Sequence, residues 1–542
     1  MRFVRGLATT VAILTLIHCS SRADGEDNVP AEGTPPSQLA AAATPAEPSR
    51  AAGAPAPAAE PHPVANAAPD PQQENSGGSQ GQTTAEGKPE TQELQGIGPA
   101  GRKLDESPFG LHVINNDLAG AHEIGGRWTR HLILWMKLEP RPGQMKDLAR
   151  AVPRINQIHD AGFEILPRIV SVNPWANQKR INQMNQEAAK KNMPMGNWTY
   201  IGMPSDIDAY KRFVTTVVES FDGDGVKDLP GLKKGVKYWQ VENEWDWRWK
   251  DSPEQFVEFL KIAHDTIKAA DSEATIVLGG ISKLEPDVFY NGMLGSSIQV
   301  KGRTITPEIL GKQPNFKEQY PLRRKVLEDG YPYFDVISFH QYGDFDAIRQ
   351  ETEYLKGIMK DKNYVRRMWI TEAGGPFIAD GEKYTEEIQA QQVVKYYVTA
   401  LASGVDVIFW STYFPTPEWG ASFANTSLMA NKTQRKPAWS TYKLMATQLE
   451  GVDGVEWIAD APHAAFVRFT RGGERPVLVA WRDPKGPSAD EIIKKVESHY
   501  GNRLEGKTFH VTHYDGRTET VKDFREGIRN LLDSGPIFIE VR

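Results

Sequence analysis

Two short segments of the chain carry a glutamate after a run of mostly apolar residues. The first is Tyr238–Glu244, with the letters YWQVENE, and the second is Met368–Gly375, with the letters MWITEAGG. Two carboxyl groups about 5–5.5 Å apart can cleave a glycosidic bond with retention, because one attacks the anomeric carbon while the other protonates the leaving oxygen. Glu244 and Glu372 are the candidates for such a pair.

Both segments belong to a longer pattern in which β-rich runs alternate with amphipathic helical stretches, which is typical of repeated βα units around a parallel sheet. Eight runs are predicted to be strands: Phe109–Val113, Arg127–Trp135, Glu164–Val170, Val236–Val241, Ala274–Gly280, Asp335–His340, Arg367–Thr371 and Val405–Trp410. Eight strands, each followed by a helix, predict an α/β fold of the (β/α)₈ TIM-barrel type over residues 104–450. Long insertions are expected after the third strand (173–204) and the fifth (282–331).

Catalytic side chains of such barrels lie at the C-terminal ends of the strands. Glu244 follows the fourth predicted strand and Glu372 follows the seventh, so both are expected at that end of the barrel. A doubly wound open sheet is the competing architecture. No GxGxxG or GxxxxGK(S/T) motif follows any predicted strand, which removes the main support for its nucleotide-binding forms.

The helices between the strands have recognisable ends. The stretch 253–270 has Ser252 as candidate N-cap, Pro253 in its first turn and Gln255 to complete a capping box. A second helix is predicted at 385–403, beginning after Thr385 and stopping at Gly404.

The two carboxylate segments resemble the catalytic motifs of glycoside hydrolase clan A, whose members carry Asn-Glu after strand four and Glu after strand seven. The resemblance covers roughly residues 106–450 and is closest to families 39 and 5. It departs after Glu244, where Trp245 replaces a frequent Pro. It implies a retaining glycosidase that cleaves an oligo- or polysaccharide by double displacement, with Glu372 as nucleophile and Glu244 as acid/base.

The same resemblance implies further substrate-site residues. Arg130, within GGRWTRHLILWMKLEPRPG, matches an active-site arginine of the clan. His340 and Tyr342 match its His-x-Tyr, which lines the nucleophile, and Trp410 matches the tryptophan that usually forms the floor of the sugar site. Asn243 would hydrogen-bond the 2-hydroxyl of the reacting sugar.

The two carboxylates need different protonation states for this chemistry. Glu372 is expected to stay ionised, helped by the charge of Arg130 and a hydrogen bond from Tyr342. Glu244 is expected to have a raised pKa, so that it begins the reaction protonated.

The loop after Glu244 is unusually aromatic. Sugar rings stack on indoles, so Trp245 and Trp247 are candidates for a binding subsite. The alternative is that two of the three tryptophans Trp245, Trp247 and Trp249 pack beneath the loop. Further candidates on loops at the same end are Trp175, Trp198 and Trp419.

Residues 451–542 return to a period of two, with candidate strands at 465–470, 476–481, 508–514 and 536–541 and a helical piece near 488–499. This pattern predicts a small β-sandwich domain that packs on the barrel.

Composition excludes several classes of function. The net charge is −7, the pI is near 6.0, and no basic run interleaved with aromatics could follow a phosphate backbone, so nucleic acid is not expected as a partner. The 12 His lack HExxH or paired Cys/His spacing, so no zinc is expected, and the proposed chemistry needs no metal or organic cofactor. The oligomeric state stays open.

The N-terminal residues indicate export. Residues 1–19 have a basic start and a short apolar stretch that ends at Cys19, the chain's 1 cysteine, and residues 16–19 resemble a bacterial lipobox. Residues 20–103 are rich in Ala, Pro, Gly and Ser and predict a disordered linker. We therefore expect a lipoprotein anchored through Cys19 to a bacterial cell envelope, at the outer membrane or cell surface. A plain signal peptide and a secreted protein are the alternative.

Two other functions remain open for this sequence. The barrel could be a catalytically inactive surface carbohydrate-binding lipoprotein in which the stacking tryptophans survive, or a structural lipoprotein that binds no sugar. The presence of both Glu244 and Glu372 argues for the enzyme, because an inactive relative would be free to lose either.

Overall fold

The structure is a computed structural model that describes residues 107–178, 181–182, 185–186, 202–300, 303–377, 383–417, 421–472 and 475–542. The expected signal peptide, Cys19 and the expected linker lie outside these residues. Among the described residues, none of the helices combines the length and apolar character required to span a bilayer.

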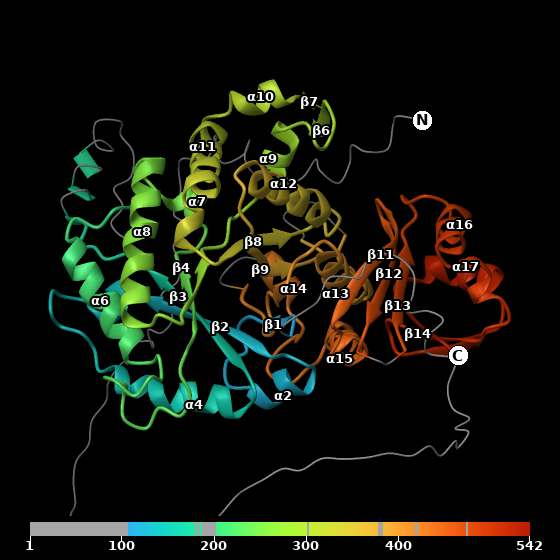
Figure 1. Cartoon of the computed structure of the whole chain (residues 1–542), viewed down its shortest axis with the longest axis horizontal. Helices are drawn as coiled ribbons and strands as arrows, with labels where there is room; N and C mark the ends of the chain where they lie inside the picture. Colours follow the sequence, from blue (N-terminus) through green and yellow to red (C-terminus); the bar gives the residue numbers. More distant parts are fainter. Residues whose placement is uncertain are drawn as a thin grey trace, which may run out of the picture. The chain divides into compact units, whose positions relative to one another are not determined.

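Eight parallel strands form a closed barrel in the order β1-β10-β9-β8-β5-β4-β3-β2. The strands are β1 (Phe109–Leu111), β2 (Trp128–Leu134), β3 (Glu164–Val170), β4 (Tyr238–Val241), β5 (Thr275–Leu278), β8 (Val336–Tyr342), β9 (Arg367–Gly374) and β10 (Val407–Trp410). All eight coincide with predicted strands, so the predicted (β/α)₈ barrel is confirmed. Helices lie around the barrel (Figure 1).

The helices of the barrel region are α2 (Leu118–Glu123), α3 (Trp135–Leu138), α4 (Val152–Asp160), α6 (Ile207–Glu219), α7 (Trp245–Arg248), α8 (Pro253–Ala270), α12 (Ala347–Asp361), α13 (Glu386–Ala402), α14 (Ala421–Thr426) and α15 (Pro437–Leu449). The capping box of Ser252 and Gln255 at α8 is present, and the Thr385 side chain caps α13. Both helix predictions are thus confirmed, because these caps satisfy backbone N–H groups that a helix leaves unpaired.

Large side chains fill the N-terminal half of the barrel interior. The buried cluster takes its members from six of the strands: Trp128, Leu166, Val277, Val336, Trp369, Val407 and Phe409, and Tyr238 of a seventh strand, β4, packs against them. The rings of Trp128 and Trp369 meet edge to face with centroids 5.1 Å apart. This packing closes one end of the barrel, which leaves the C-terminal ends of the strands for polar residues.

The predicted insertion after the fifth strand is present, and all of it except residues 301–302 belongs to the described residues. It contains α9 (Glu285–Tyr290), a two-stranded sheet of β6 (Ile298–Val300) and β7 (Arg303–Ile305), α10 (Pro307–Gly311) and α11 (Pro314–Asp329). Figure 1 shows β6, β7 and α10 beside one another. Much of the other predicted insertion, at 173–204, lies outside the described residues.

The C-terminal region differs from the predicted sandwich. Its described residues form one six-stranded antiparallel sheet in the order β11-β12-β13-β16-β14-β15, accompanied by α16 (Ala489–Tyr500) and α17 (Arg529–Leu531). The strands are β11 (Gly454–Ala461), β12 (Ala464–Thr470), β13 (Val477–Arg482), β14 (Phe509–His513), β15 (Thr518–Val521) and β16 (Ile537–Val541). Sequence inspection missed β11 and β15.

Alternate residues of this sheet enter different cores. Phe466 and Leu478 join the cluster formed with Ile492 and Val496 of α16, whereas Val467 and Val479 join the core of the barrel. Helices therefore cover one face and the barrel covers the other. A second sheet is unnecessary because the barrel supplies the layer that it would have provided.

Candidate active site

Glu372 lies near the C-terminal end of β9 and is held by two donors. Arg130 of β2 donates from Nη1 to Glu372 Oε1 at 2.6 Å, and the Tyr342 hydroxyl of β8 donates to Oε2 at 2.8 Å. The Glu372 residue is only 7% exposed. A carboxylate with both oxygens bonded in a buried site is fixed in position.

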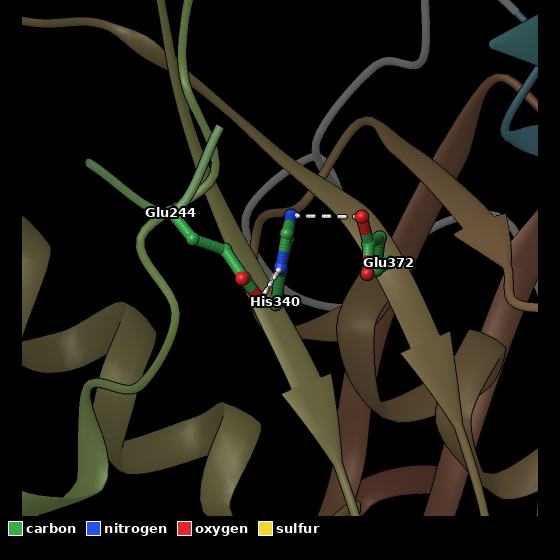
Figure 2. A group of neighbouring side chains, drawn as sticks. All are labelled: Glu244, His340 and Glu372. Atoms are coloured by element: carbon green, nitrogen blue, oxygen red, sulfur yellow. Dashed lines mark hydrogen bonds and ion pairs between the residues drawn. The ribbon is translucent and has the colours of Figure 1, made fainter. Parts of the chain in front are cut away.

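Glu244 follows β4 and faces Glu372 from the other side of His340 (Figure 2). Its backbone is in the left-handed region, with φ 47° and ψ 40°. Trp247 Nε1 donates to Glu244 Oε2 at 3.1 Å, and an Arg248 nitrogen lies 3.7 Å from the same oxygen. Left-handed backbone at a non-glycine residue is strained and concentrates at functional sites.

His340 of β8 stands between the two carboxylates. Its Nδ1 is 3.2 Å from Glu244 Oε1, within hydrogen-bonding distance, and its Nε2 is 3.6 Å from Glu372 Oε1. One carboxylate oxygen of Glu244, one of Glu372 and one His340 nitrogen all lie within 4.8 Å of one another. This spacing suits a pair of carboxyl groups that acts on opposite sides of one bond.

The same three groups could in principle ligate a metal ion. However, Arg130 already donates to Glu372 Oε1, and an Arg168 nitrogen lies 3.6 Å from that same oxygen. Two guanidinium groups at this oxygen repel a cation, so the site is better suited to ionised carboxylates than to a metal.

Arg130 ties the substrate-site residues into one network. Besides Glu372 it donates from Nε to Gln240 at 2.8 Å and from Nη2 to Asn243 Oδ1 at 2.6 Å. Its side chain is fully buried. The structure thus brings Arg130, Asn243, His340 and Tyr342 together with both glutamates, as the resemblance implied for their positions.

The pKa values of the two carboxyl groups shift in the same direction. Burial alone would raise the pKa of Glu372, but the positive charges of His340 and Arg130 outweigh it, so this pKa lies far below its usual range. The pKa of Glu244 was expected to be raised. It is lowered instead, because the hydrogen bond and charge of His340 outweigh both burial and the repulsion from Glu372.

Two of the three tryptophans in the aromatic loop, Trp245 and Trp249, are buried, as the alternative interpretation proposed. Trp247 is 42% exposed and the Arg248 guanidinium lies over its ring, at 4.7 Å from the centroid. Trp245 is fully buried, stacks on Phe256 and donates to the Gly279 carbonyl. Its assignment as a sugar-stacking residue is therefore wrong, because its ring presents no face to a ligand.

The other tryptophan candidates also differ in their surroundings. Trp410 has no exposed surface, and its Nε1 donates to the Thr426 carbonyl, so it does not form an open floor in this structure. Trp175 is half-buried and packs edge to face on Trp135. Trp198 and Trp419 lie outside the described residues.

Three groups near the glutamates were not predicted from the sequence: the half-buried Arg168 and the buried His112 and Glu242. Arg168 is a charged residue within the apolar run EILPRIV, and that contrast was the available signal. His112 directly follows β1, where the rule on strand ends applies; burial lowers its pKa, and the charge of Glu372 opposes that shift.

Glu242 is fully buried two residues before Glu244, with φ 68°, and its Oε1 accepts the Ser171 backbone N–H at 2.8 Å. Burial raises its pKa from 4.5 to about 7. Between those two pH values the native state binds more protons than the unfolded state, so the free energy of unfolding falls as pH rises.

Replacing Glu242 by Gln is expected to remove this fall in the free energy of unfolding with rising pH. Above pH 7 the variant should gain on the order of 3 kcal/mol relative to wild type, with little difference below pH 4.5. Urea denaturation at pH 4.5 and pH 8 measures this. An unchanged pH dependence in the variant would show that Glu242 is not protonated in the native state.

Gly280 follows β5 and lies against His340. Its carbonyl accepts the Glu244 N–H at 2.9 Å, and a Cβ at this position would overlap His340 Nε2. We expect Gly280→Ala to displace His340 and to cost about 1–3 kcal/mol of stability together with a large loss of activity. The control is Gly357→Ala in α12, where a Cβ meets open space. It should be neutral or slightly stabilising in thermal unfolding.

Comparisons with known proteins place the fold. The sequence matches no protein-family model and no curated protein. Solved structures do match. One is a family 39 glycoside hydrolase from the gut symbiont Bacteroides cellulosilyticus WH2, with 15% identity, a TM-score of 0.52 and 81% of each chain covered. Another is a glucosidase from Croceicoccus marinus, with 12% identity, a TM-score of 0.51, and 82% of this chain and 97% of that chain covered. The similarity of this chain to these proteins is a similarity of fold.

Proposed function

We propose that the protein is a retaining glycoside hydrolase with Glu372 as nucleophile and Glu244 as general acid and base. The observation that carries this proposal is the spacing of the two carboxylates, which project from β9 and the end of β4 with one oxygen of each within 4.8 Å. That separation fits attack by one group and protonation by the other. The glycoside hydrolases that share the fold support the same reading.

In the first step the ionised Glu372 attacks the anomeric carbon while Glu244 gives its proton to the leaving oxygen. Arg130 and Tyr342 hold Glu372 in place for this attack. Because the pKa of Glu244 is lowered in the free site, the reactive protonated form dominates only at acid pH. We therefore expect kcat/KM to fall as pH rises through that pKa.

Formation of the glycosyl ester removes the negative charge of Glu372. That charge raises the pKa of Glu244 in the free site, so its loss lowers this pKa further. Glu244 is then ionised and can take a proton from the water that attacks the ester. One residue thus serves as acid in the first step and as base in the second.

Trp247 marks the side of the leaving group. Its indole donates to Glu244 Oε2, and it is one of the few large apolar side chains exposed among the described residues. A sugar unit whose oxygen is protonated by Glu244 would lie beside this ring and could stack on it. The substrate proposed is accordingly an oligo- or polysaccharide with a sugar on each side of the cleaved bond.

The decisive experiment is hydrolysis of a panel of aryl glycosides and plant, algal and bacterial polysaccharides, with Glu372→Gln as the control. NMR of the first-formed product should show the anomeric configuration of the substrate. An inverted product would contradict the double displacement. Sugar binding without turnover would favour the inactive binding protein.

We further propose that the mature protein is attached to a bacterial cell envelope by a lipid on Cys19, with residues 20–103 as a linker to the folded part. The proposal rests on the lipobox-like residues 16–19 and on the absence of another cysteine in the sequence. Wild type is expected in the membrane fraction, and Cys19→Ser in the soluble fraction. Equal fractionation of the two would rule out the anchor.

A further inference from the structure

The loop between α6 and β4 carries a second group of carboxylates. Asp222, Asp224 and Asp228 lie within the segment DGDGVKD, and one oxygen of each is within 4.8 Å of the others. The loop leads into the first residue of β4, whereas Glu244 follows the last strand residue, so the group lies at the opposite end of the barrel from the candidate active site.

Asp222 is the buried member of this group, and its carboxylate is poorly satisfied by hydrogen bonds. The residue has no exposed surface, and its Oδ1 accepts only a long bond, 3.4 Å, from the Asp224 N–H. Its Oδ2 is buried and has no hydrogen-bond partner among the described residues. A buried carboxylate oxygen without a donor costs free energy unless another group satisfies it.

The other two carboxylates are held in place by the loop backbone. Asp228 accepts the N–H groups of Gly223 at 2.8 Å and Gly225 at 2.7 Å, and Asp224 accepts that of Val226 at 2.6 Å. Each carboxylate oxygen has two lone pairs, so an oxygen that accepts one N–H can still bind a cation. The loop therefore fixes these oxygens without using up their capacity.

The nearby lysines neutralise other acids. Lys237 pairs with Asp271 at 3.0 Å and lies 3.8 Å from Glu273, and Lys227 pairs with Glu219 at 3.1 Å. None of the described ion pairs joins a cationic side chain to Asp222, Asp224 or Asp228, and the charges of Lys237 and Asp271, which are paired with each other, both act on Asp222. Three carboxylates thus converge without a direct ion-pair partner among the described residues.

We propose that Asp222, Asp224 and Asp228 form a calcium-binding site that braces the loop between α6 and β4. Oxygen donors with high negative charge are the ligands of Ca²⁺, which accepts irregular geometry more readily than Mg²⁺. The loop is not an EF-hand, because Val226 occupies its fifth position and Lys233 its twelfth, where that motif places ligands. The inference does not depend on the proposed hydrolase activity.

The packing of the loop indicates what the ion would stabilise. Gly235 lies directly against the Asp222 backbone, and the Val236 N–H donates to the Phe221 carbonyl at 2.8 Å. Two residues later β4 begins. An ion at Asp222 would therefore hold the entry of β4 and raise the stability of the barrel, without a part in the chemistry at its other end.

The test uses the full chain after removal of metal with a chelator. CaCl₂ is titrated at constant ionic strength, and thermal unfolding and calorimetric heat are recorded, with MgCl₂ in parallel. We expect one ion bound per chain and a rise of at least about 2 °C in the unfolding midpoint. The double variant Asp224→Asn/Asp228→Asn should lose both the bound ion and the rise in the unfolding midpoint. The matched control, Asp361→Asn/Glu505→Gln, makes the same charge change at exposed residues and should keep both.

A second control separates this site from the group formed by Glu244, His340 and Glu372. Glu372→Gln is expected to bind Ca²⁺ as wild type does, and loss of binding there would move the site to the active centre and overturn the proposal. Absence of calcium heat in wild type would overturn it as well. Should the double variant not fold, the single variant Asp224→Asn decides, since Asp224 is exposed and its substitution should weaken binding at least tenfold.

Discussion

Replacing Glu372 by Ala is expected to lower the hydrolysis of aryl glycosides on the order of 10⁴-fold or more, because no other group in the site can form the covalent intermediate. The loss should be nearly the same for good and poor leaving groups, since attack on the anomeric carbon is removed in both cases. Steady-state kinetics on a series of aryl glycosides measures this dependence.

Replacing Glu244 by Ala should have a different signature. Substrates whose leaving group needs no proton should still form the intermediate, giving a burst of aryl alcohol followed by slow release of sugar, because the general base is missing. Substrates with a sugar leaving group should be slowed about 10²–10⁴-fold.

Azide separates the two roles by stereochemistry. With Glu244→Ala it should attack the glycosyl ester and yield a glycosyl azide of retained configuration. With Glu372→Ala it can enter only the space left by the nucleophile and should yield the inverted product. The opposite pattern would mean that the roles are exchanged, and two variants as active as wild type would refute the hydrolase proposal.

Arg323→Met is expected to cause the largest loss of stability among substitutions away from the glutamates, about 3–5 kcal/mol. Arg323 of α11 is 1% exposed and donates from Nε to Asp287 at 2.9 Å and from Nη1 to Asp246 at 3.1 Å. Both aspartates have fully buried side chains. Removing the guanidinium leaves two carboxylates in a nonpolar interior without a counter-ion.

Urea denaturation measures this loss, and the neighbouring Arg324→Met is the control. Arg324 pairs with Glu328 one turn along the same helix near the surface, so its removal should cost less than about 1 kcal/mol. Because Asp246 lies in α7 beside Trp247, Arg323→Met should also reduce kcat/KM. Equal effects of the two substitutions would show that the buried ion pairs contribute nothing beyond surface charge.

The barrel was predictable because its strands are short apolar runs with clear limits, and a rule about strand ends then located the catalytic candidates. Glu244 and Glu372 could be found in this way because Glu244 follows β4 (Tyr238–Val241) closely and Glu372 lies near the end of β9 (Arg367–Gly374). Arg168 was not predicted because it lies inside β3 and not at its end, although an arginine inside an apolar strand is itself a signal.

Features that depend on packing between distant segments could not be read from the sequence. Trp245 and Trp247 are two residues apart in one loop, yet one is buried and the other exposed, since Phe256 of α8 covers only the first. The lowered pKa of Glu244 depends on His340, 96 residues away along the chain. The single C-terminal sheet depends on the barrel surface that takes the place of a second sheet.

The barrel surface that takes the place of a second sheet limits how the protein can be shortened. A polypeptide cut near residue 450 would expose to water the barrel surface that packs against Val467, Val479 and Trp481. Trimming from the other direction is no safer, because β16 at Ile537–Val541 lies between β13 and β14 and its loss would split the sheet. A shortened version of the protein should therefore keep the barrel and the sheet together as one unit of expression, even though the sequence changes character between them.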